Sequence, residues 1–276
     1  MVPPFFYMKK SNTHFEINNL LEAKKYDEAV LLIDNEIVNN PENFLSYYYK
    51  GMHSLGVKSF ELAIENLLKA SEIDKKKNYP YQQYISFCYM SLADISINND
   101  NYVEAESLYN RSLDYTKDYI GAYHGLGSLY FSKNDFINSE KYYKKALIVN
   151  PNFHLSLLGL AYVKQSLNKV DEAINYAKKC LKLSPDAFKA HYLLGLLYFD
   201  KKDLDLSLSS FQESQLIDPK NEYVLSYIVR CHILNGNYDQ AYNIYSTYIE
   251  DSNIYSRALY GLRIYLDFIS GNNTNT

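Results

Sequence analysis

Histidine, cysteine and glycine are the residue types here that could do chemistry, and their spacing decides whether they can. The six histidines and three cysteines lack the paired spacing of a zinc site, and the chain contains no HExxH or GxxxxGK motif. Gly121, Gly125 and Gly127 form a glycine-rich stretch, but an apolar helical pattern surrounds them, which favours packing over phosphate binding. No set of residues combines a nucleophile, a base and an oxyanion donor. We therefore predict no catalytic residue, no metal site and no cofactor.

The composition favours helices joined by short turns. Ten glycines and seven prolines in 276 residues leave few for the turns of a many-stranded sheet, while 47% apolar residues suffice for a core. The formal net charge of −4 provides no field that would hold a polyanion, so no nucleic-acid partner is expected. No apolar run approaches the roughly 20 residues of a membrane span, so no membrane insertion is expected. The odd, widely spaced cysteines predict no disulfide framework, which favours a reducing, cytoplasmic location.

A repeat of 34 residues organises the chain. A small residue recurs within apolar-periodic stretches at Ala29, Ala63, Ala105, Ser139, Ala173, Ser207 and Ala241. Five of the six intervals are 34 residues long, and the interval from Ala63 to Ala105 is 42. An apolar residue stands three positions before each small residue, and in four units a proline stands twelve positions after it.

Each unit predicts an antiparallel pair of helices. Apolar residues three and four apart in both halves make two amphipathic helices, joined by polar turns such as residues 133–136. The small residues are expected where the helices cross most closely, and the prolines where the second helix ends. One hairpin cannot bury its apolar stripe alone, so the units must stack. The predicted fold is an all-α, right-handed superhelical α-solenoid of stacked antiparallel helical hairpins.

This pattern resembles the tetratricopeptide repeat, over about nine tenths of the chain. The segment from 123 to 151 matches it closely through Tyr123, Leu126, Gly127, Tyr130, Phe136, Ser139, Tyr143, Ala146 and Pro151. The resemblance implies repeats at 10–43, 44–85, 86–119, 120–153, 154–187, 188–221 and 222–255, with a capping helix at 256–269, a poorly ordered leader at 1–9 and a disordered tail at 270–276. The first repeat departs from the pattern at Thr13, Glu16 and Ile17, which fits a solvated cap.

The longer interval contains eight extra residues, around Lys75 to Gln82. Lengthening both flanking helices by about one turn each would keep the buried faces in phase, because two turns take about 7.2 residues. Pro80 would then lie in the first turn of the longer helix, and the lysines at 75–77 would be cations at a helix C-terminus. The alternative is a surface loop that binds a partner. We favour the longer helices.

Two histidines and two cysteines fall at inward-facing places of the repeat. His191 and His232 stand where the repeat has buried aromatic residues, which favours core imidazoles over metal ligands. Cys180 and Cys231 are expected to act as small hydrophobic residues in the core.

The geometry of the repeat predicts where a partner would bind. The first helix of each hairpin lines the concave side, with exposed places at the second, fifth, ninth and twelfth positions of the unit. In repeats two to seven, 16 of these 24 places are apolar, and only Asp94, Lys189 and Arg230 are charged, the opposite of a solvated face. The alternatives are packing across a narrow groove and a tyrosine-rich composition that reaches every surface. The candidate partner-binding residues are Tyr48, Met52, Phe87, Met90, His124, Phe131, Leu158, Tyr162, Tyr192, Phe199, Tyr223 and Arg230.

Basic residues gather in the middle of the chain, where residues 120–187 carry nine basic and five acidic side chains. The excess comes largely from second helices, on the convex side, at Lys141, Lys144, Lys145, Lys178, Lys179 and Lys182. Solvation of the outer face explains these lysines, and the alternative is a docking patch for an acidic partner.

The family resemblance also bears on one known kind of partner. Members that hold the acidic C-termini of chaperones use a basic, asparagine-bearing clamp on three consecutive first helices. The matching places here carry His14, Asn18, Tyr49, Phe87 and Ser91, of which only the asparagine agrees. Chaperone C-terminal tails are therefore not expected partners.

These observations predict a non-enzymatic protein–protein interaction scaffold or adaptor. Its ligand would be an extended or helical peptide of a partner protein with apolar anchors, lying along the concave groove. One alternative is a structural subunit of a larger or self-associating assembly, which includes a homo-oligomer. Another is a regulatory array that serves a separately encoded enzyme.

Overall fold

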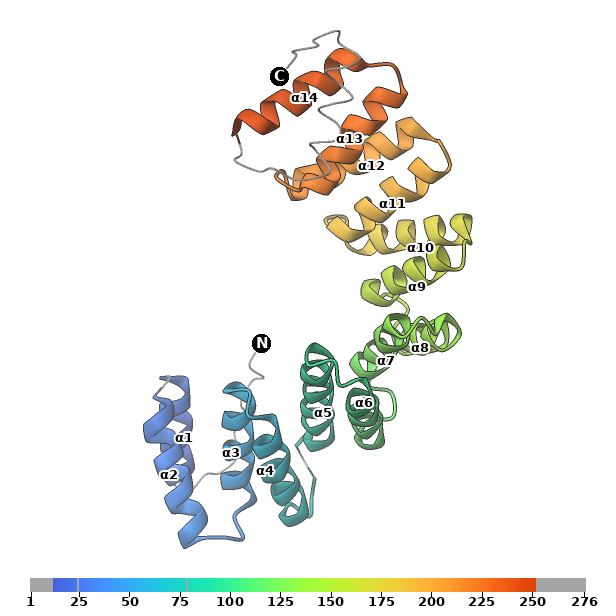
Figure 1. Ribbon diagram of the computed structural model, residues 1–276. Helices are drawn as coiled ribbons and strands as arrows, with labels where there is room; N and C mark the ends of the chain where they lie inside the picture. Colours follow the sequence, from blue (N-terminus) through green and yellow to red (C-terminus); the bar gives the residue numbers. More distant parts are fainter. Residues whose placement is uncertain (1–11, 24, 78, 252–276) are drawn as a thin grey trace. The chain divides into compact units, whose positions relative to one another are not determined.

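Helices and short turns make up the part of the chain that the structure describes, residues 12–23, 25–77 and 79–251 of a computed structural model (Figure 1). The fourteen helices of this part are α1 (Asn12–Glu22), α2 (Tyr26–Asn39), α3 (Phe44–Gly56), α4 (Phe60–Ile73), α5 (Tyr81–Asn98), α6 (Tyr102–Tyr115), α7 (Ile120–Ser132), α8 (Phe136–Val149), α9 (His154–Ser166), α10 (Val170–Leu183), α11 (Phe188–Asp200), α12 (Leu204–Ile217), α13 (Glu222–Leu234) and α14 (Tyr238–Asp251). The same residues contain no strand.

The chain divides into two compact units between Leu129 and Tyr130, which we call the first and the second unit. Within each unit, helices that follow one another in the chain pack together as stacked hairpins. The predicted all-α solenoid of antiparallel hairpins is confirmed. The leader (1–9), the capping helix (256–269) and the tail (270–276) lie outside the described residues.

The 34-residue phase appears in the second helix of every hairpin. Helices α2, α4, α6, α8, α10, α12 and α14 each have 14 residues. The small residue of the repeat is the fourth residue of each, and none has any exposed surface: Ala29, Ala63, Ala105, Ser139, Ala173, Ser207 and Ala241. A larger side chain at this place would hold the neighbouring helices apart.

Side chains of complementary size face each other at a second place of the repeat. A Cβ atom added to Gly159 on α9 would meet the ring of Tyr143 on α8. One repeat later the sizes are exchanged, since Ala177 on α10 and Leu193 on α11 lie in the same core cluster. The exchange keeps the packed volume nearly constant, as a close-packed interior requires.

Each of six hairpin turns has one residue in the left-handed region of backbone conformation, two residues before the second helix begins. These residues are Lys58, Asp100, Asn134, Asn168, Lys202 and Gly236, and the five that are not glycine have φ of 57–62°. Each turn also closes the end of the first helix through a backbone bond, as in the 2.9 Å bond from the Asp203 amide to the Tyr198 carbonyl. The polar turns of the repeat therefore have a conformational requirement that glycine meets best.

The eight-residue insertion lengthens only the helix that follows it. Helix α4 has 14 residues, like the other second helices, whereas α5 has 18 where most first helices have 13. The remaining extra residues widen the connection at 74–80. The prediction that both flanking helices gain a turn is thus right for α5 and wrong for α4. Pro80 is the N-cap of α5, and Lys75, Lys76 and Lys77 lie in the connection after α4.

Buried side chains hold this connection in place. The hydroxyl of Tyr81, a residue with no exposed surface, donates to Oδ2 of Asp74 at 3.1 Å. Asp74 is only 4% exposed, and its Oδ1 accepts from the backbone amide of Lys76 at 3.1 Å. Tyr79 packs against Tyr48 of α3. Tyr79 and Tyr81 of the insertion therefore belong to the core of the first unit.

Gly159→Ala is expected to lower the free energy of unfolding by roughly 1–3 kcal/mol, because the added methyl group overpacks against Tyr143. Urea unfolding followed by circular dichroism measures the change. Gly56→Ala is the control and should be neutral or stabilising, since a Cβ there meets no atom within 4 Å. In a Tyr143→Leu background Gly159→Ala should cost less, and an equal cost in both backgrounds would contradict this explanation.

The left-handed turns predict opposite effects for two substitutions. Gly236→Ala should destabilise by about 1–2 kcal/mol, and this cost is conformational because nothing lies within 4 Å of the new Cβ. Lys202→Gly should stabilise by about 0.5–1 kcal/mol, the relief of left-handed strain less the entropy of glycine. Thermal unfolding midpoints of the two variants test the pair, and two shifts in the same direction would refute it.

Candidate functional site

The first unit covers one of the predicted groove residues. The ring centroid of Tyr48 lies 4.6 Å from that of Tyr79 and 5.8 Å from that of Tyr81, and Tyr48 is only 7% exposed. Burial raises its pKa, and the neighbouring Tyr84 raises the pKa further. Tyr48 is therefore a core residue, which corrects its prediction as an exposed groove contact. The tyrosines of the insertion are the reason.

Other predicted groove residues of the first unit keep part of their surface. Met52, Met90 and His124 are half-buried, and Phe87 is 37% exposed with its ring 6.3 Å from that of Phe60. They come from helices α3, α5 and α7.

Asp94, the acidic residue at a groove place of the first unit, already has a partner. Its Oδ1 accepts a hydrogen bond from the hydroxyl of Tyr109 on α6. Burial raises the pKa of Asp94, and the bond from Tyr109 opposes this rise. The carboxylate is thus tied to the neighbouring second helix.

In the second unit, aromatic side chains from four successive first helices form a contiguous set, which we call the aromatic row: Phe131, Tyr162, Tyr192, Phe199 and Tyr227. The rings of Phe131 and Tyr162 lie 6.4 Å apart. The Tyr162 hydroxyl reaches the backbone carbonyl of Lys189 on α11 at 3.5 Å. The ring of Tyr227 lies 6.3 Å from Tyr192 and 5.3 Å from Phe199. All five side chains are half-buried, so each presents part of its ring to solvent.

Two tyrosines of the aromatic row, Tyr162 and Tyr192, have raised pKa values. Burial raises the pKa of Tyr162, and nearby Tyr192 raises it further. Burial also raises the pKa of Tyr192, as do Tyr227 and Tyr223, while Arg230 opposes this rise. Neutral phenols combine an apolar ring with a hydroxyl that can donate or accept a hydrogen bond, which suits a recognition surface.

Three further residues predicted to line the groove lie near the aromatic row and differ from one another in exposure. Leu158 is 8% exposed and belongs to the core between α9 and its neighbours, so it offers almost no contact surface. Tyr223 is 67% exposed, and Arg230 is half-buried. The sequence prediction missed Tyr227, which stands at the sixth place of its repeat. Its spacing of four from Tyr223 and three from Arg230 was the available signal, because such residues share one helix face.

The predicted convex lysines form a surface that we call the basic face: Lys141, Lys144, Lys145, Lys178, Lys179 and Lys182. They lie on α8 and α10, and all but the half-buried Lys145 are exposed. The ring of Tyr142 is flanked by the ammonium groups of Lys141 at 5.7 Å and Lys145 at 5.3 Å, and it stacks on Tyr130. Cation–π contacts of this kind fix the lysine stems against the surface.

A buried ion pair network lies beside the basic face. Lys164 of α9 is only 4% exposed and pairs with Glu140 of α8 at 3.0 Å and with Glu172 of α10 at 2.8 Å. Glu140 also pairs with Lys144 at 2.6 Å. Partial burial would raise the pKa of Glu140, but the bonds from Lys144 and Lys164 outweigh it and lower the pKa. The network ties three consecutive helices together.

The histidines and cysteines show no arrangement for chemistry. Cys180 and Cys231 have no exposed surface, and burial raises the pKa of each thiol. His232 is 8% exposed, and burial lowers its pKa. His191 is only half-buried and lies 2.7 Å from the Pro185 carbonyl through Nε2, so its prediction as a core residue is corrected. Among the residues whose side chains the structure describes, no group of three or more histidine, cysteine, aspartate or glutamate residues could hold a metal ion.

Two of the residues at the positions of the chaperone-tail clamp are buried by packing. His14 and Asn18 are 5% and 6% exposed. Nε2 of His14 lies 2.8 Å from the side-chain amide nitrogen of Asn43, the N-cap residue of α3. Neither side chain presents a surface for a ligand.

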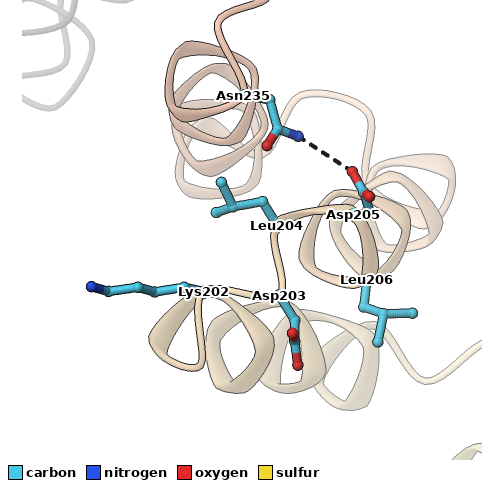
Figure 2. Close-up of a pocket in the computed structure, with 6 residues that line it drawn as sticks. All are labelled: Lys202, Asp203, Leu204, Asp205, Leu206 and Asn235. Carbon is cyan, nitrogen blue, oxygen red and sulfur yellow. Dashed lines mark hydrogen bonds between the residues drawn. The ribbon is translucent and has the colours of Figure 1, made fainter.

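A hollow at the turn between α11 and α12 is a weaker candidate than the aromatic row (Figure 2). It is lined by Lys202, Asp203, Leu204, Asp205, Leu206 and Asn235. The Asn235 amide donates to Oδ1 of Asp205 at 3.4 Å, while the side chains of Lys202 and Asp203 point in different directions. Groups that do not converge define no ligand.

Comparisons with known proteins agree with this architecture. Two family models described as tetratricopeptide repeat match the chain, over residues 120–153 and 158–222. No curated protein sequence matches it. None of the described helices is both long and apolar enough to cross a membrane.

Several solved structures are similar in fold. The structure of YrrB, described as a TPR protein with an unusual peptide-binding site, is 20% identical over 73% of this chain and 100% of its own, with a TM-score of 0.55. MamA from Desulfovibrio magneticus RS-1 is 16% identical over 60% of this chain and 93% of its own, with a TM-score of 0.53. The Cut9–Hcn1 hetero-tetramer of the APC/C is 18% identical over 78% of this chain and 48% of its own, with a TM-score of 0.50. At these identities the likeness establishes the fold alone.

Lys164→Met is expected to lower the free energy of unfolding at neutral pH by about 1–3 kcal/mol, because Glu140 and Glu172 lose a charged partner. The pKa of Glu140 is lowered in the fold, so the stabilisation is present above the ordinary glutamate pKa and is lost as pH falls through the lowered value. The pKa of Lys164 is raised, so the stabilisation is also lost at strongly alkaline pH. Urea unfolding of both proteins across pH measures this, and a difference that does not change with pH would contradict it.

Proposed function

We propose that this chain, which contains tetratricopeptide repeats at residues 120–153 and 158–222, is a non-enzymatic interaction module. It binds a peptide segment of a partner protein along the aromatic row of the second unit. The observation that carries the proposal is the succession of half-buried rings over four first helices. Ring contacts join α7 to α9 and α11 to α13, and the Tyr162 hydroxyl joins α9 to α11. Isolated exposed apolar residues are ordinary on a protein surface, whereas contiguous ones mark interaction sites.

The aromatic row supports a peptide with apolar or aromatic anchors spaced along its length. Successive rings stand on successive helices, so a ligand that contacts several of them must run across the helices rather than along one. A ring already packed on one side loses little conformational freedom on binding, because tyrosine has only two side-chain torsions. The neutral hydroxyls of Tyr162 and Tyr192 can bond to the peptide backbone.

The family relationship supports a binding role in coarser form. YrrB, similar in fold, is a TPR protein with a peptide-binding site. The stacked hairpins described above provide the rigid scaffold on which such a surface can be held. The identity of the groove as the binding surface, a cytoplasmic location and the absence of catalysis belong to this proposal.

A second candidate function is a structural role in a larger or self-associating assembly. Ile137 and Ile148 on α8 are 82% and 80% exposed, and Val103 on α6 is 81% exposed. Apolar side chains on second helices would be covered if neighbouring subunits packed there. The basic face on α8 and α10 would favour an acidic neighbour. Sedimentation of the purified chain separates the two functions, because a free peptide-binding module is monomeric and an assembly subunit self-associates.

The double substitution Tyr162→Ala with Tyr192→Ala is expected to weaken peptide binding by at least roughly 30-fold, since two interface tyrosines that each contribute roughly 1 kcal/mol or more together contribute at least about 2 kcal/mol. The measurement is capture of peptides from a phage-displayed random library, followed by fluorescence anisotropy with the tightest synthetic peptide. Circular dichroism checks that helicity is retained.

Tyr242→Ala is the matched control for this experiment. Tyr242 is 39% exposed on the second helix α14 and lies outside the aromatic row. It should leave binding unchanged. Equal binding by the wild-type chain and the double variant would rule out the aromatic row as the site.

A further inference from the structure

Arg230 lies on the same face of α13 as two tyrosines of the site. Tyr223, Tyr227 and Arg230 are spaced by four and three residues, so they line one side of the helix. The guanidinium carbon of Arg230 lies 5.2 Å from the centroid of the Tyr227 ring. Its charge also reaches the neighbouring helix, because it opposes the rise in the pKa of Tyr192 on α11. The guanidinium is therefore part of the surface that the aromatic row forms.

This cation has no carboxylate partner among the side chains that the structure describes, those of residues 13–247 apart from positions 24 and 78. The contrast with the other charged groups is clear. The buried Lys164 pairs with two glutamates, and Asp94, the acidic residue at a groove place of the first unit, bonds to Tyr109. A half-buried guanidinium that loses part of its hydration without a counter-charge is left with unused hydrogen-bond donors.

The groove places of the second unit also carry an excess of positive charge. From Phe131 to Ile233 they include two cations, Lys189 and Arg230, and no aspartate or glutamate. Lys189 is exposed at the second place of α11, next to the hydroxyl of Tyr162. Both charged residues at these groove places are therefore cations.

We propose that the peptide bound along the aromatic row carries an aspartate or glutamate side chain that pairs with Arg230. This inference rests on the proposed function and specifies its ligand. The planar guanidinium can take a carboxylate through two parallel bonds, and the Tyr227 ring beneath it holds it in position.

The position of Arg230 favours a side chain of the peptide over its terminal carboxylate. The peptide runs from helix to helix, whereas Tyr223 and Arg230 are separated along α13 by about 10 Å, seven residues at about 1.5 Å each. Arg230 stands at the ninth place of its repeat, between the sixth place of Tyr227 and the twelfth place of Phe199, so it lies among the anchors, where a side chain that branches from the peptide reaches it.

The test first selects peptides and then changes one charge in the peptide and one in the protein. A phage-displayed library of random dodecapeptides is panned against the full chain, and the tightest peptide is synthesised with a fluorescein label as the probe. Matched probes carry glutamine or asparagine in place of each acidic residue, and one further probe has an amidated C-terminus. Anisotropy gives the dissociation constant of each probe for the wild-type chain, Arg230→Gln, Arg230→Lys and Arg230→Glu. Lys75→Gln, which removes an exposed cation in the first unit, is the charge control.

The expected result is selection of peptides rich in aromatic and acidic residues, with one acidic residue coupled to Arg230. Arg230→Gln should weaken binding of the acidic probe at least about tenfold and leave binding of the matching amide probe nearly unchanged. The affinity of Arg230→Lys for the acidic probe should lie between those of the wild-type chain and Arg230→Gln, because lysine keeps the charge and loses the second hydrogen bond. Arg230→Glu should prefer a probe with lysine at the coupled position. The amidated probe and Lys75→Gln should bind as the wild-type pair does.

Two kinds of failure are distinguishable. If peptides are selected and need Tyr162 and Tyr192, but Arg230→Gln weakens acidic and amide probes equally, the carboxylate inference is wrong and the proposed function stands. Weakening by C-terminal amidation alone would overturn the assignment to a side chain. If the wild-type chain selects no peptide that the Tyr162→Ala, Tyr192→Ala double variant loses, the proposed function fails and this inference fails with it.

Discussion

Close approach of helices at one small residue per hairpin is the constraint on which the rest of the structure depends. The fourth residue of each second helix is alanine or serine and has no exposed surface, so neighbouring helices pack in one rotational phase. Gly159 opposite Tyr143, and Leu193 near Ala177, preserve that phase where side-chain sizes change. Because each helix has a defined buried face, its remaining faces are defined as well. A surface that extends over several hairpins can therefore be built from residues 34 apart.

The insertion shows how such an array absorbs extra residues without losing phase. Five of the eight residues extend α5 at its N-terminal end, and the others widen the connection that Tyr81 and Asp74 hold in the core. The buried face of α5 therefore keeps its register with α6. The same residues bring Tyr79 and Tyr81 over Tyr48 and close that place to solvent. The insertion thereby makes the first unit differ from the second at an equivalent position of the repeat.

The aromatic rings at groove places of the second unit stay partly open. Phe131, Tyr162 and Tyr192 contact neighbours on the next helix through ring edges and one hydroxyl, which orders them without covering them. Such rings are rigid before a ligand arrives, so binding costs less conformational entropy than it would with free side chains. Arg230 places a positive charge beside this apolar surface. Recognition by this arrangement would depend on shape and charge and requires no reactive group.

Local periodicity determined the helices, their pairing and the phase of the repeat, because apolar spacing and turn residues act over a few positions along the chain. The same reasoning correctly placed the small residues, the buried Cys180 and the exposed lysines of α8 and α10. It could not decide whether a groove place is open, since that depends on which side chains from other segments reach it. Tyr48 and Tyr192 both occupy the fifth place of their repeats, yet only Tyr48 is covered. Tyr227 joins the aromatic row from a place that the pattern did not mark. Exposure was decided by the tertiary structure, because burial is a property of the neighbours of a residue in space and not of its own position in the repeat.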